Sequence, residues 1–238
     1  MTRKEVLAEG VELWLGDCRD VLQLLGPHDA LCTDPPYGIE YSSGTSNRKR
    51  GKAVYSGVFE DTRQNIIDVV IPAVRASLEL CGGRGVVTPG SPNLWLYPEP
   101  DALGGFYQPA ALGMNKWGFA NLNPVCFYGK DPRAGKDIQA TVLKVTEGPS
   151  SDEHPCAKPL GAMKWMVSRV SEARDLILDP FMGSGTTGVA AVILGRKFTG
   201  IELDEGYFDT ACRRIEAALR EPDMFIPIPK PSKQQAFI

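Results

Sequence analysis

The segment with the clearest chemistry is Asp34-Pro35-Pro36-Tyr37, which directly follows the apolar run 30–33. A carboxylate accepts hydrogen bonds from N–H groups, so Asp34 is suited to hold an exocyclic amine. The two prolines stiffen the backbone, and a carbonyl fixed in this way is a second, preorganised acceptor. Tyr37 offers a flat surface on which an extruded base can lie. We predict that these four residues bind a planar base and activate its amino group, although the tetrapeptide alone would also suit an ordinary proline turn.

A second candidate site is the glycine-rich stretch that contains Gly183, Gly185 and Gly188. Its spacing, G-x-G-x-x-G between a predicted strand and a predicted helix, allows a tight turn and close approach of the backbone to a ligand. Glu202 ends the next predicted strand, where it can accept hydrogen bonds from ribose hydroxyls. The pattern predicts a nucleoside cofactor, and on its own it suits a nicotinamide or flavin enzyme equally well. Its place near the end of the sequence leaves no room for a second nucleotide-binding half, which disfavours a dehydrogenase.

Together, in this order, the two motifs resemble those of the β-class amino DNA methyltransferases. The run Asp179-Pro-Phe-Met-Gly-Ser-Gly-Thr-Thr-Gly is similar to the S-adenosylmethionine loop of that family, and Gly200-Ile-Glu-Leu-Asp204 is similar to its next motif. The run His154-Pro-Cys-Ala-Lys-Pro is similar to the motif that contacts the methionine end of the cofactor, with Ala157 where many members have Gln. In most related folds the glycine loop comes first, so the reversed order here resembles the permuted β class.

The resemblance implies transfer of a methyl group from S-adenosylmethionine to N6 of a flipped adenine in double-stranded DNA. Asp at position 34 favours adenine, because the enzymes that methylate N4 of cytosine more often have Ser there. Cytosine-N4 methylation is the alternative, followed by an RNA methyltransferase and a catalytically silent DNA-binding module. Asp17 resembles the acid that reaches the cofactor adenine, and it would equally suit a helix N-cap. The cofactor contacts implied by the resemblance are Asp17, Lys158, Asp179, Phe181, Gly183, Ser184, Gly185, Thr186, Glu202 and Asp204.

The charge distribution is relevant to the DNA partner. The net charge is −3, so attraction to phosphates must come from a local basic patch. Arg48, Lys49, Arg50 and Lys52 form the densest basic cluster, in a Gly/Ser/Asn-rich stretch just after the proline motif. We predict that this loop contacts the DNA backbone, and a solvated loop is the alternative. Because the family commonly dimerises, the resemblance also implies a homodimer.

The composition narrows the class of protein further. The six cysteines are scattered and only two histidines are present, so we expect buried free thiols and neither a metal site nor a disulfide framework. The sequence has no apolar run near the roughly 18 residues that a membrane span needs, and it starts without a signal peptide. These features predict a cytoplasmic protein.

The order of the expected elements predicts the fold class. Strands and helices alternate, which predicts an α/β fold with a doubly wound, mostly parallel sheet, and the resemblance implies the circularly permuted, Rossmann-like methyltransferase order. We expect one domain over 1–221, DNA-contacting insertions near 38–60, 96–118 and 130–154, and an extended Pro-rich tail over 222–238. The predicted strands are 11–15, 30–33, 84–88, 124–128, 176–178 and 198–202, and the predicted helices are 17–25, 62–80 (kinked or restarted at Pro72), 160–170, 186–194 and 205–219.

Overall fold

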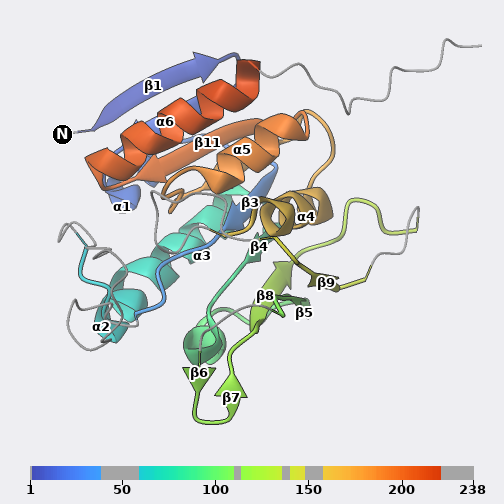
Figure 1. Ribbon diagram of the computed structural model, residues 1–238. Helices are drawn as coiled ribbons and strands as arrows, with labels where there is room; N and C mark the ends of the chain where they lie inside the picture. The colour runs from blue at the N-terminus through green and yellow to red at the C-terminus, as the bar shows by residue number, and fades with distance from the viewer. Residues whose placement is uncertain (1, 39–58, 110–113, 136–139, 148–157, 221–238) are drawn as a thin grey trace, which may run out of the picture.

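The computed structural model describes residues 2–38, 59–109, 114–135, 140–147 and 158–220, with only the backbone at 114 and 115. This part of the chain contains a nine-stranded sheet in the order β1-β2-β11-β10-β3-β4-β8-β5-β9 (Figure 1). Its strands are β1 (Arg3–Ala8), β2 (Val11–Leu15), β3 (Ala30–Thr33), β4 (Gly85–Val87), β5 (Ala102–Tyr107), β8 (Leu122–Tyr128), β9 (Val142–Lys144), β10 (Leu176–Asp179) and β11 (Lys197–Glu202). A separate hairpin is formed by β6 (Met114–Asn115) and β7 (Gly118–Phe119).

The centre of the large sheet is parallel. Strands β2, β11, β10, β3 and β4 pair in parallel, in that order. Antiparallel pairing joins β1 to β2 and β8 to both β4 and β5, and β9 is parallel to β5. All four residues of β3 are buried, as expected of a parallel strand covered on both faces. The predicted α/β fold with a mostly parallel sheet is confirmed.

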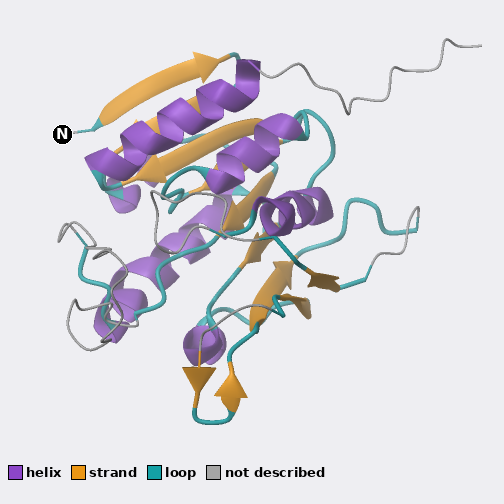
Figure 2. Ribbon diagram, viewed as in Figure 1, coloured by secondary structure: helices purple, strands orange, loops and turns teal. Residues whose placement is uncertain are grey.

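Helices cover both faces of the sheet (Figure 2). One hydrophobic cluster joins α4, α5 and α6 to one face, and a second joins α1 and α3 to the other. Successive residues of β3 alternate between the two, since Cys32 belongs to the first cluster and Leu31 to the second. The helical segments are α1 (Cys18–Val21), η1 (Leu22–Leu24), α2 (Arg63–Asn65), η2 (Ile66–Val70), α3 (Ile71–Leu80), η3 (Ser91–Leu96), α4 (Leu160–Val170), α5 (Thr186–Ile193) and α6 (Glu205–Arg220).

The connections change face between β3 and β10. The chain leaves β3, passes through α3 on one face and returns as β4, whereas it leaves β10, passes through α5 on the other face and returns as β11. The sheet therefore has a topological switch point between β3 and β10. In open α/β sheets, ligands bind beside such a point at the carboxyl ends of the strands.

The helix predicted over 62–80 is divided into three segments. Thr62 begins it as an N-cap, and its side chain accepts a hydrogen bond from the amide of Asn65. The middle segment, η2, is a π-helix, and Pro72 lies in the first turn of α3. Because Pro72 has no N–H to donate, the regular pattern cannot pass through it. The predicted restart at Pro72 is confirmed.

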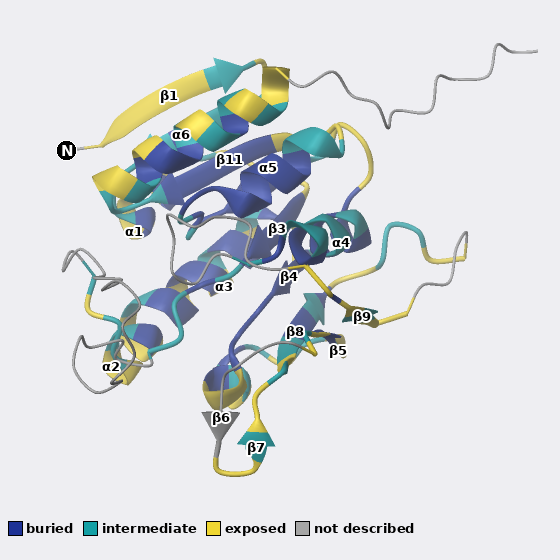
Figure 3. Cartoon of the chain, viewed as in Figure 1, coloured by how far each residue is buried: buried dark blue, intermediate teal, exposed yellow. Residues whose placement is uncertain are grey.

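No strand was predicted in the stretches 96–118 and 130–154, but they contain β5 and β9. A Cβ at Gly104 of β5 would lie only 2.0 Å from the carbonyl oxygen of Thr141. Glycine thus permits the close approach of these two backbones, although it weakens the sequence pattern of a strand. Strand β1 was not predicted either, since most of this edge strand is exposed (Figure 3).

Several predicted features lie outside the described residues: most of the stretch 38–60, with the basic cluster 48–52, the tail 222–238, and residues 154–157. Among the described cysteines, four are buried and all are free thiols. The same part of the chain contains no helix that is both long and apolar enough to cross a membrane.

Candidate active site and cofactor site

The parallel strands bring the two predicted motifs together at one edge of the sheet. In the register of β3 and β10, Leu31 lies opposite Leu178, so the loops after both strands leave the same edge. Strand β11 is the parallel neighbour of β10 on its other side and ends at Glu202. Neighbouring strands are about 4.8 Å apart. The Asp34 loop, the glycine loop and Glu202 therefore follow one another along the carboxyl edge, beside the switch point.

The carboxylate of Asp34 is the centre of a polar cluster. Its Oδ1 accepts hydrogen bonds from the hydroxyls of Tyr37, at 2.7 Å, and Thr88, at 2.5 Å. Its Oδ2 accepts a hydrogen bond from Nζ of Lys158 at 2.7 Å. Thr88 follows β4 and Lys158 precedes α4, so three separate segments converge on this carboxylate. Such contacts fix its orientation before any substrate is present.

The ring of Tyr37 is also held in place. Burial, together with the nearby charge of Asp34, raises the pKa of Tyr37, so its hydroxyl stays protonated as a donor. The amide of Asn93 donates to the backbone carbonyl of Tyr37 at 2.6 Å. Gly90, with a φ of 68°, lies close to the Tyr37 ring. A Cβ at this position would be 2.9 Å from Cγ of the ring. The ammonium of Lys158 lies over the ring, 4.8 Å from its centroid.

The glycine loop is joined to Glu202 by backbone hydrogen bonds. The carboxylate of Glu202 accepts from the amides of Gly183, Leu203 and Asp204 at 2.8–2.9 Å. Since a carboxylate has about four lone-pair positions, one stays open for another donor. Burial raises the pKa of Glu202 to about 7, against the opposing effect of these amides. A partly exposed carboxylate with spare acceptor capacity beside a glycine turn fits the ribose of a nucleoside cofactor.

Hydrogen bonds made by Arg214 and Asp179 also support the glycine loop. Arg214 of α6 donates to the carbonyl and hydroxyl of Ser184, at 2.6 and 2.9 Å, and to the hydroxyl of Thr186. Asp179 accepts hydrogen bonds from the hydroxyl of Thr33 at 2.7 Å and from the amide of Phe181. Burial raises the pKa of Asp179 to about 6. Ser184 and Asp179, both predicted to contact the cofactor, are thus buried and bonded to the protein.

The remaining predicted contacts are placed as follows. Asp17 caps α1 by accepting from the amide of Arg19, and it also pairs with the Arg19 side chain. Asp204 accepts from the amide of Tyr207 at the start of α6. Lys158 was predicted to contact the cofactor, and the structure brings its ammonium to Asp34. Direct cofactor contacts by these residues stay predictions.

Sequence reasoning missed several residues that shape the site: Thr33, Thr88, Gly90, Asn93 and Arg214. Thr88 carried a usable signal, because it ends a strand predicted over 84–88 and such ends meet at the carboxyl edge. Arg214 carried none, because its role depends on how α6 packs against the glycine loop.

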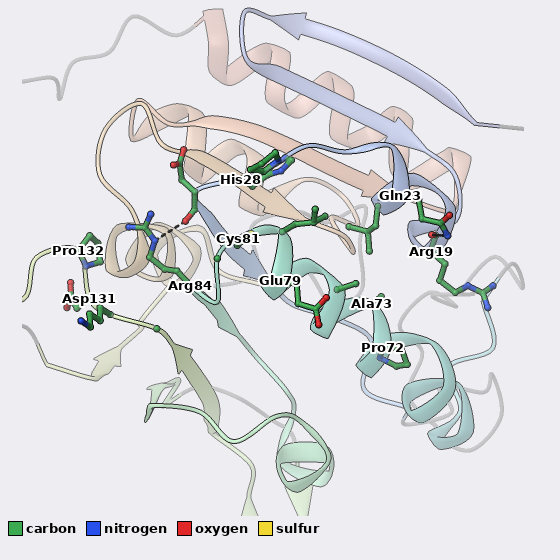
Figure 4. Close-up of a pocket in the computed structure, with 18 residues that line it drawn as sticks. Arg19, Gln23, His28, Pro72, Ala73, Glu79, Cys81, Arg84, Asp131 and Pro132 are labelled. Atoms are coloured by element: carbon green, nitrogen blue, oxygen red, sulfur yellow. Dashed lines mark hydrogen bonds between the residues drawn. The ribbon is translucent and has the colours of Figure 1, made fainter.

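A broad groove of about 1280 Å³ lies elsewhere on the molecule (Figure 4). Its lining includes Pro27, His28 and Asp29 just before β3, and Arg84 just before β4. The guanidinium of Arg84 donates to the carbonyl of Asp29 across this region. These residues mark the amino ends of the parallel strands, so the groove is separate from the Asp34 and Glu202 cluster at the opposite edge.

Several solved structures share this fold. Two of them are M1.HpyAVI (TM-score 0.61, 20% identity, covering 85% of this chain and 97% of that one) and PvuII DNA methyltransferase, cytosine-N4-specific (TM-score 0.59, 17% identity, covering 90% and 87%). At these identities the likeness concerns the fold. The fold is that of the Rossmann-like DNA methyltransferases.

The family follows from a match to the DNA methylase family model over residues 95–213, half of the chain. The chain belongs to this DNA methylase family. Among its relatives are type II methyltransferase M2.DpnII of Streptococcus pneumoniae, 38% identical over 37% of this chain and 32% of that protein, and DNA adenine methyltransferase YhdJ of Escherichia coli K12, 42% identical over 28% and 23%. The matches thus span about a third or less of the length of these relatives.

Proposed function

We propose that this protein transfers a methyl group from S-adenosylmethionine to N6 of a flipped adenine in double-stranded DNA. The observation that carries the proposal is the position of the Asp34 carboxylate, oriented by Tyr37 and Thr88, next to the glycine loop at the switch point. The names of the relatives support it, since one is a DNA adenine methyltransferase. Two related structures in this fold were solved as complexes with S-adenosylmethionine.

The residues that bind the cofactor and those that bind the base lie on opposite sides of the switch point. The glycine loop and Glu202 hold the cofactor, with Glu202 accepting from the ribose. When bound, S-adenosylmethionine supplies an electrophilic methyl group on a positively charged sulfur, which leaves as a neutral sulfide. The loop after β3 holds the base, with Pro35 buried and Asp34 and Tyr37 partly buried.

Asp34 activates the amine of the base. The lone pair of an exocyclic amine is delocalised into the ring, so the nitrogen must become more tetrahedral before it can attack. Asp34 accepts one of its N–H groups, and a carbonyl of Pro35 or Pro36 accepts the other. A methylated amine would carry a positive charge on its nitrogen. Asp34 stabilises that charge and takes the extra proton.

The activity is tested by long-read sequencing of genomic DNA from cells that express the protein. Wild type should produce N6-methyladenine at one short motif, and Asp34→Ala should produce none while still binding S-adenosylmethionine. Asp209→Ala removes an exposed carboxylate on α6 and serves as the matched control. Detection of N4-methylcytosine would show that the target base is cytosine and not adenine. Unmodified DNA from cells that contain soluble, cofactor-binding protein would contradict the proposal.

The basic cluster Arg48–Lys52 is the proposed contact with the DNA backbone. Each phosphate contact that is lost should reduce the slope of log affinity against log salt by about 0.9. Replacing its four basic residues by Gln should therefore flatten the salt dependence and weaken binding to all sequences alike. Arg174→Gln with Lys197→Gln, at the amino edge of the sheet, is the control. An unchanged slope would show that the basic cluster does not contact the DNA backbone.

A further inference from the structure

The ammonium of Lys158 makes two contacts that the proposed mechanism assigns to the target base. It lies 2.7 Å from Oδ2 of Asp34 and 4.8 Å from the centre of the Tyr37 ring. The side chain of Lys158 is only 13% exposed and that of Asp34 21%, so this pair is largely shielded from water. Asp34 is the acceptor expected for the amine, and Tyr37 is the surface expected for the ring.

The hydrogen bonds of Asp34 show where an incoming amine can bind. Its Oδ1 already accepts from the hydroxyls of Tyr37 and Thr88, and so is fully used by the protein. Its Oδ2 accepts from Lys158. An amine that approaches Asp34 must therefore share or take the oxygen that the ammonium now holds.

The pair is strong enough to matter in the free enzyme. Burial by itself would lower the pKa of Lys158, but the opposite charge of Asp34 and the hydrogen bond to it outweigh this effect, and the net shift of the pKa is upward. Lys158 is thus charged at physiological pH. A largely buried carboxylate without an opposite charge nearby would be destabilising, so the ammonium balances the charge of Asp34 while no base is bound.

We propose that Lys158 stands in for the target amine: its ammonium occupies Oδ2 of Asp34 and the face of the Tyr37 ring until the base displaces it. This inference rests on the proposed function, because it concerns the same base-binding loop. Removal of the ammonium should strengthen binding of the flipped base, because Asp34 then has no cation that competes with the amine. A cation that holds Asp34 more firmly should have the opposite effect.

The test uses a duplex that contains the motif found by sequencing, with 2-aminopurine in place of the target adenine and S-adenosylhomocysteine present to prevent turnover. Fluorescence of 2-aminopurine rises when the base leaves the stack. Lys158→Met should increase the flipped fraction by about threefold or more, the order of a modest change in coupling between charged partners. Lys158→Arg, with its planar fork of donors, should decrease it. Lys164→Met, in the following helix α4, controls for the loss of one positive charge.

The opposite signs of the two variants separate this role from a purely structural one, which would lower the signal in both. If Lys158→Met does not fold, the predicted decrease for Lys158→Arg still tests the inference. Calorimetry should find the affinity for S-adenosylmethionine unchanged within about twofold, well below 1 kcal/mol. A large loss of cofactor affinity with an unchanged fluorescence signal would overturn the inference and assign Lys158 to the cofactor. A wild-type protein that neither flips nor methylates any base would instead refute the proposed function.

Discussion

The hydroxyl of Thr33 donates a hydrogen bond to Oδ1 of Asp179 over 2.7 Å, inside the protein core. Thr33 ends β3, which leads into the Asp34 loop, and Asp179 ends β10, which leads into the glycine loop. Both side chains are almost completely buried. This bond therefore fixes the position of the proposed base site relative to the proposed cofactor site, at the point where the two loops diverge.

The buried carboxyl of Asp179 should make folding stability depend on pH. Burial raises its pKa from 3.8 to about 6, so between these values the folded protein binds more protons than the unfolded chain. The contribution of Asp179 to the free energy of unfolding should accordingly be largest below about pH 4 and fall as pH rises through about 6. The fall that belongs to Asp179 is about 3 kcal/mol, from 1.36 kcal/mol per pKa unit.

Asp179→Asn isolates this effect, because Asn keeps an acceptor for Thr33 but cannot ionise. Urea unfolding should find the variant about as stable as wild type near pH 4 and more stable by up to about 3 kcal/mol near pH 7. Any contribution from Glu202 is common to both proteins and cancels in the difference. A stability difference that stays constant across this range would contradict the assignment.

Thr33→Val tests the bond between the two loops by removing its donor and preserving the shape of the side chain. With one donor to a buried carboxyl lost, we expect unfolding to require about 1–3 kcal/mol less free energy at pH 7. Turnover should fall as well, since both loops lose a shared support. The control is Thr141→Val, because Thr141 is exposed and directly precedes β9. Wild-type stability in Thr33→Val would show that other contacts suffice to hold Asp179.

The parts of the site that were predictable lie in continuous runs of sequence. Asp34 to Tyr37 and Gly183 to Gly188 each carry their own chemistry, and each follows a strongly apolar strand. Parallel strands end at one edge, so their alternation with helices was enough to expect that the two motifs meet.

The unpredicted parts depend on contacts between distant segments. Thr88 and Lys158 contact Asp34 from 54 and 124 residues away in the sequence. No local sequence pattern indicates either contact. Resemblance placed Lys158 at the cofactor, whereas in the structure its ammonium donates to the carboxylate of Asp34. Strand β5 escaped notice for a related reason, because its glycines are explained only by the backbone that lies against them.

Cofactor affinity should depend on the ionisation of Glu202. Ribose hydroxyls donate to a carboxylate better than to a neutral acid, so binding should favour the ionised form. Because the pKa of Glu202 is raised to about 7, the affinity should increase with pH up to that value. Below it, affinity for S-adenosylmethionine should fall by about tenfold per pH unit, as for any single required ionisation. Isothermal titration calorimetry between pH 5.5 and 8.5, in roughly half-unit steps, measures this directly.

Two substitutions define the source of that pH dependence. Glu202→Gln should bind more weakly above pH 7 and show a flat profile. Asp17→Asn should keep the wild-type profile, because hydrogen bonds from Arg19 lower the pKa of Asp17 and it stays ionised throughout. An identical slope in Glu202→Gln would mean that another group titrates.

Gly90 offers a way to disturb Tyr37 without touching either charged partner of the ring. A Cβ at Gly90 would lie 2.9 Å from the ring, so Gly90→Ala should push Tyr37 away from Asp34 and reduce turnover by about tenfold or more, the effect of a misplacement near 1 Å. Gly82→Ala is the matched control, because Gly82 also has a positive φ, 58°, but a Cβ there would meet nothing within 4 Å.

Both variants should lose about 1 kcal/mol of stability through backbone strain. Only Gly90→Ala should lose methyl transfer, measured with tritiated S-adenosylmethionine at saturating cofactor. Equal turnover in the two variants would show that the position of the Tyr37 ring does not limit the reaction.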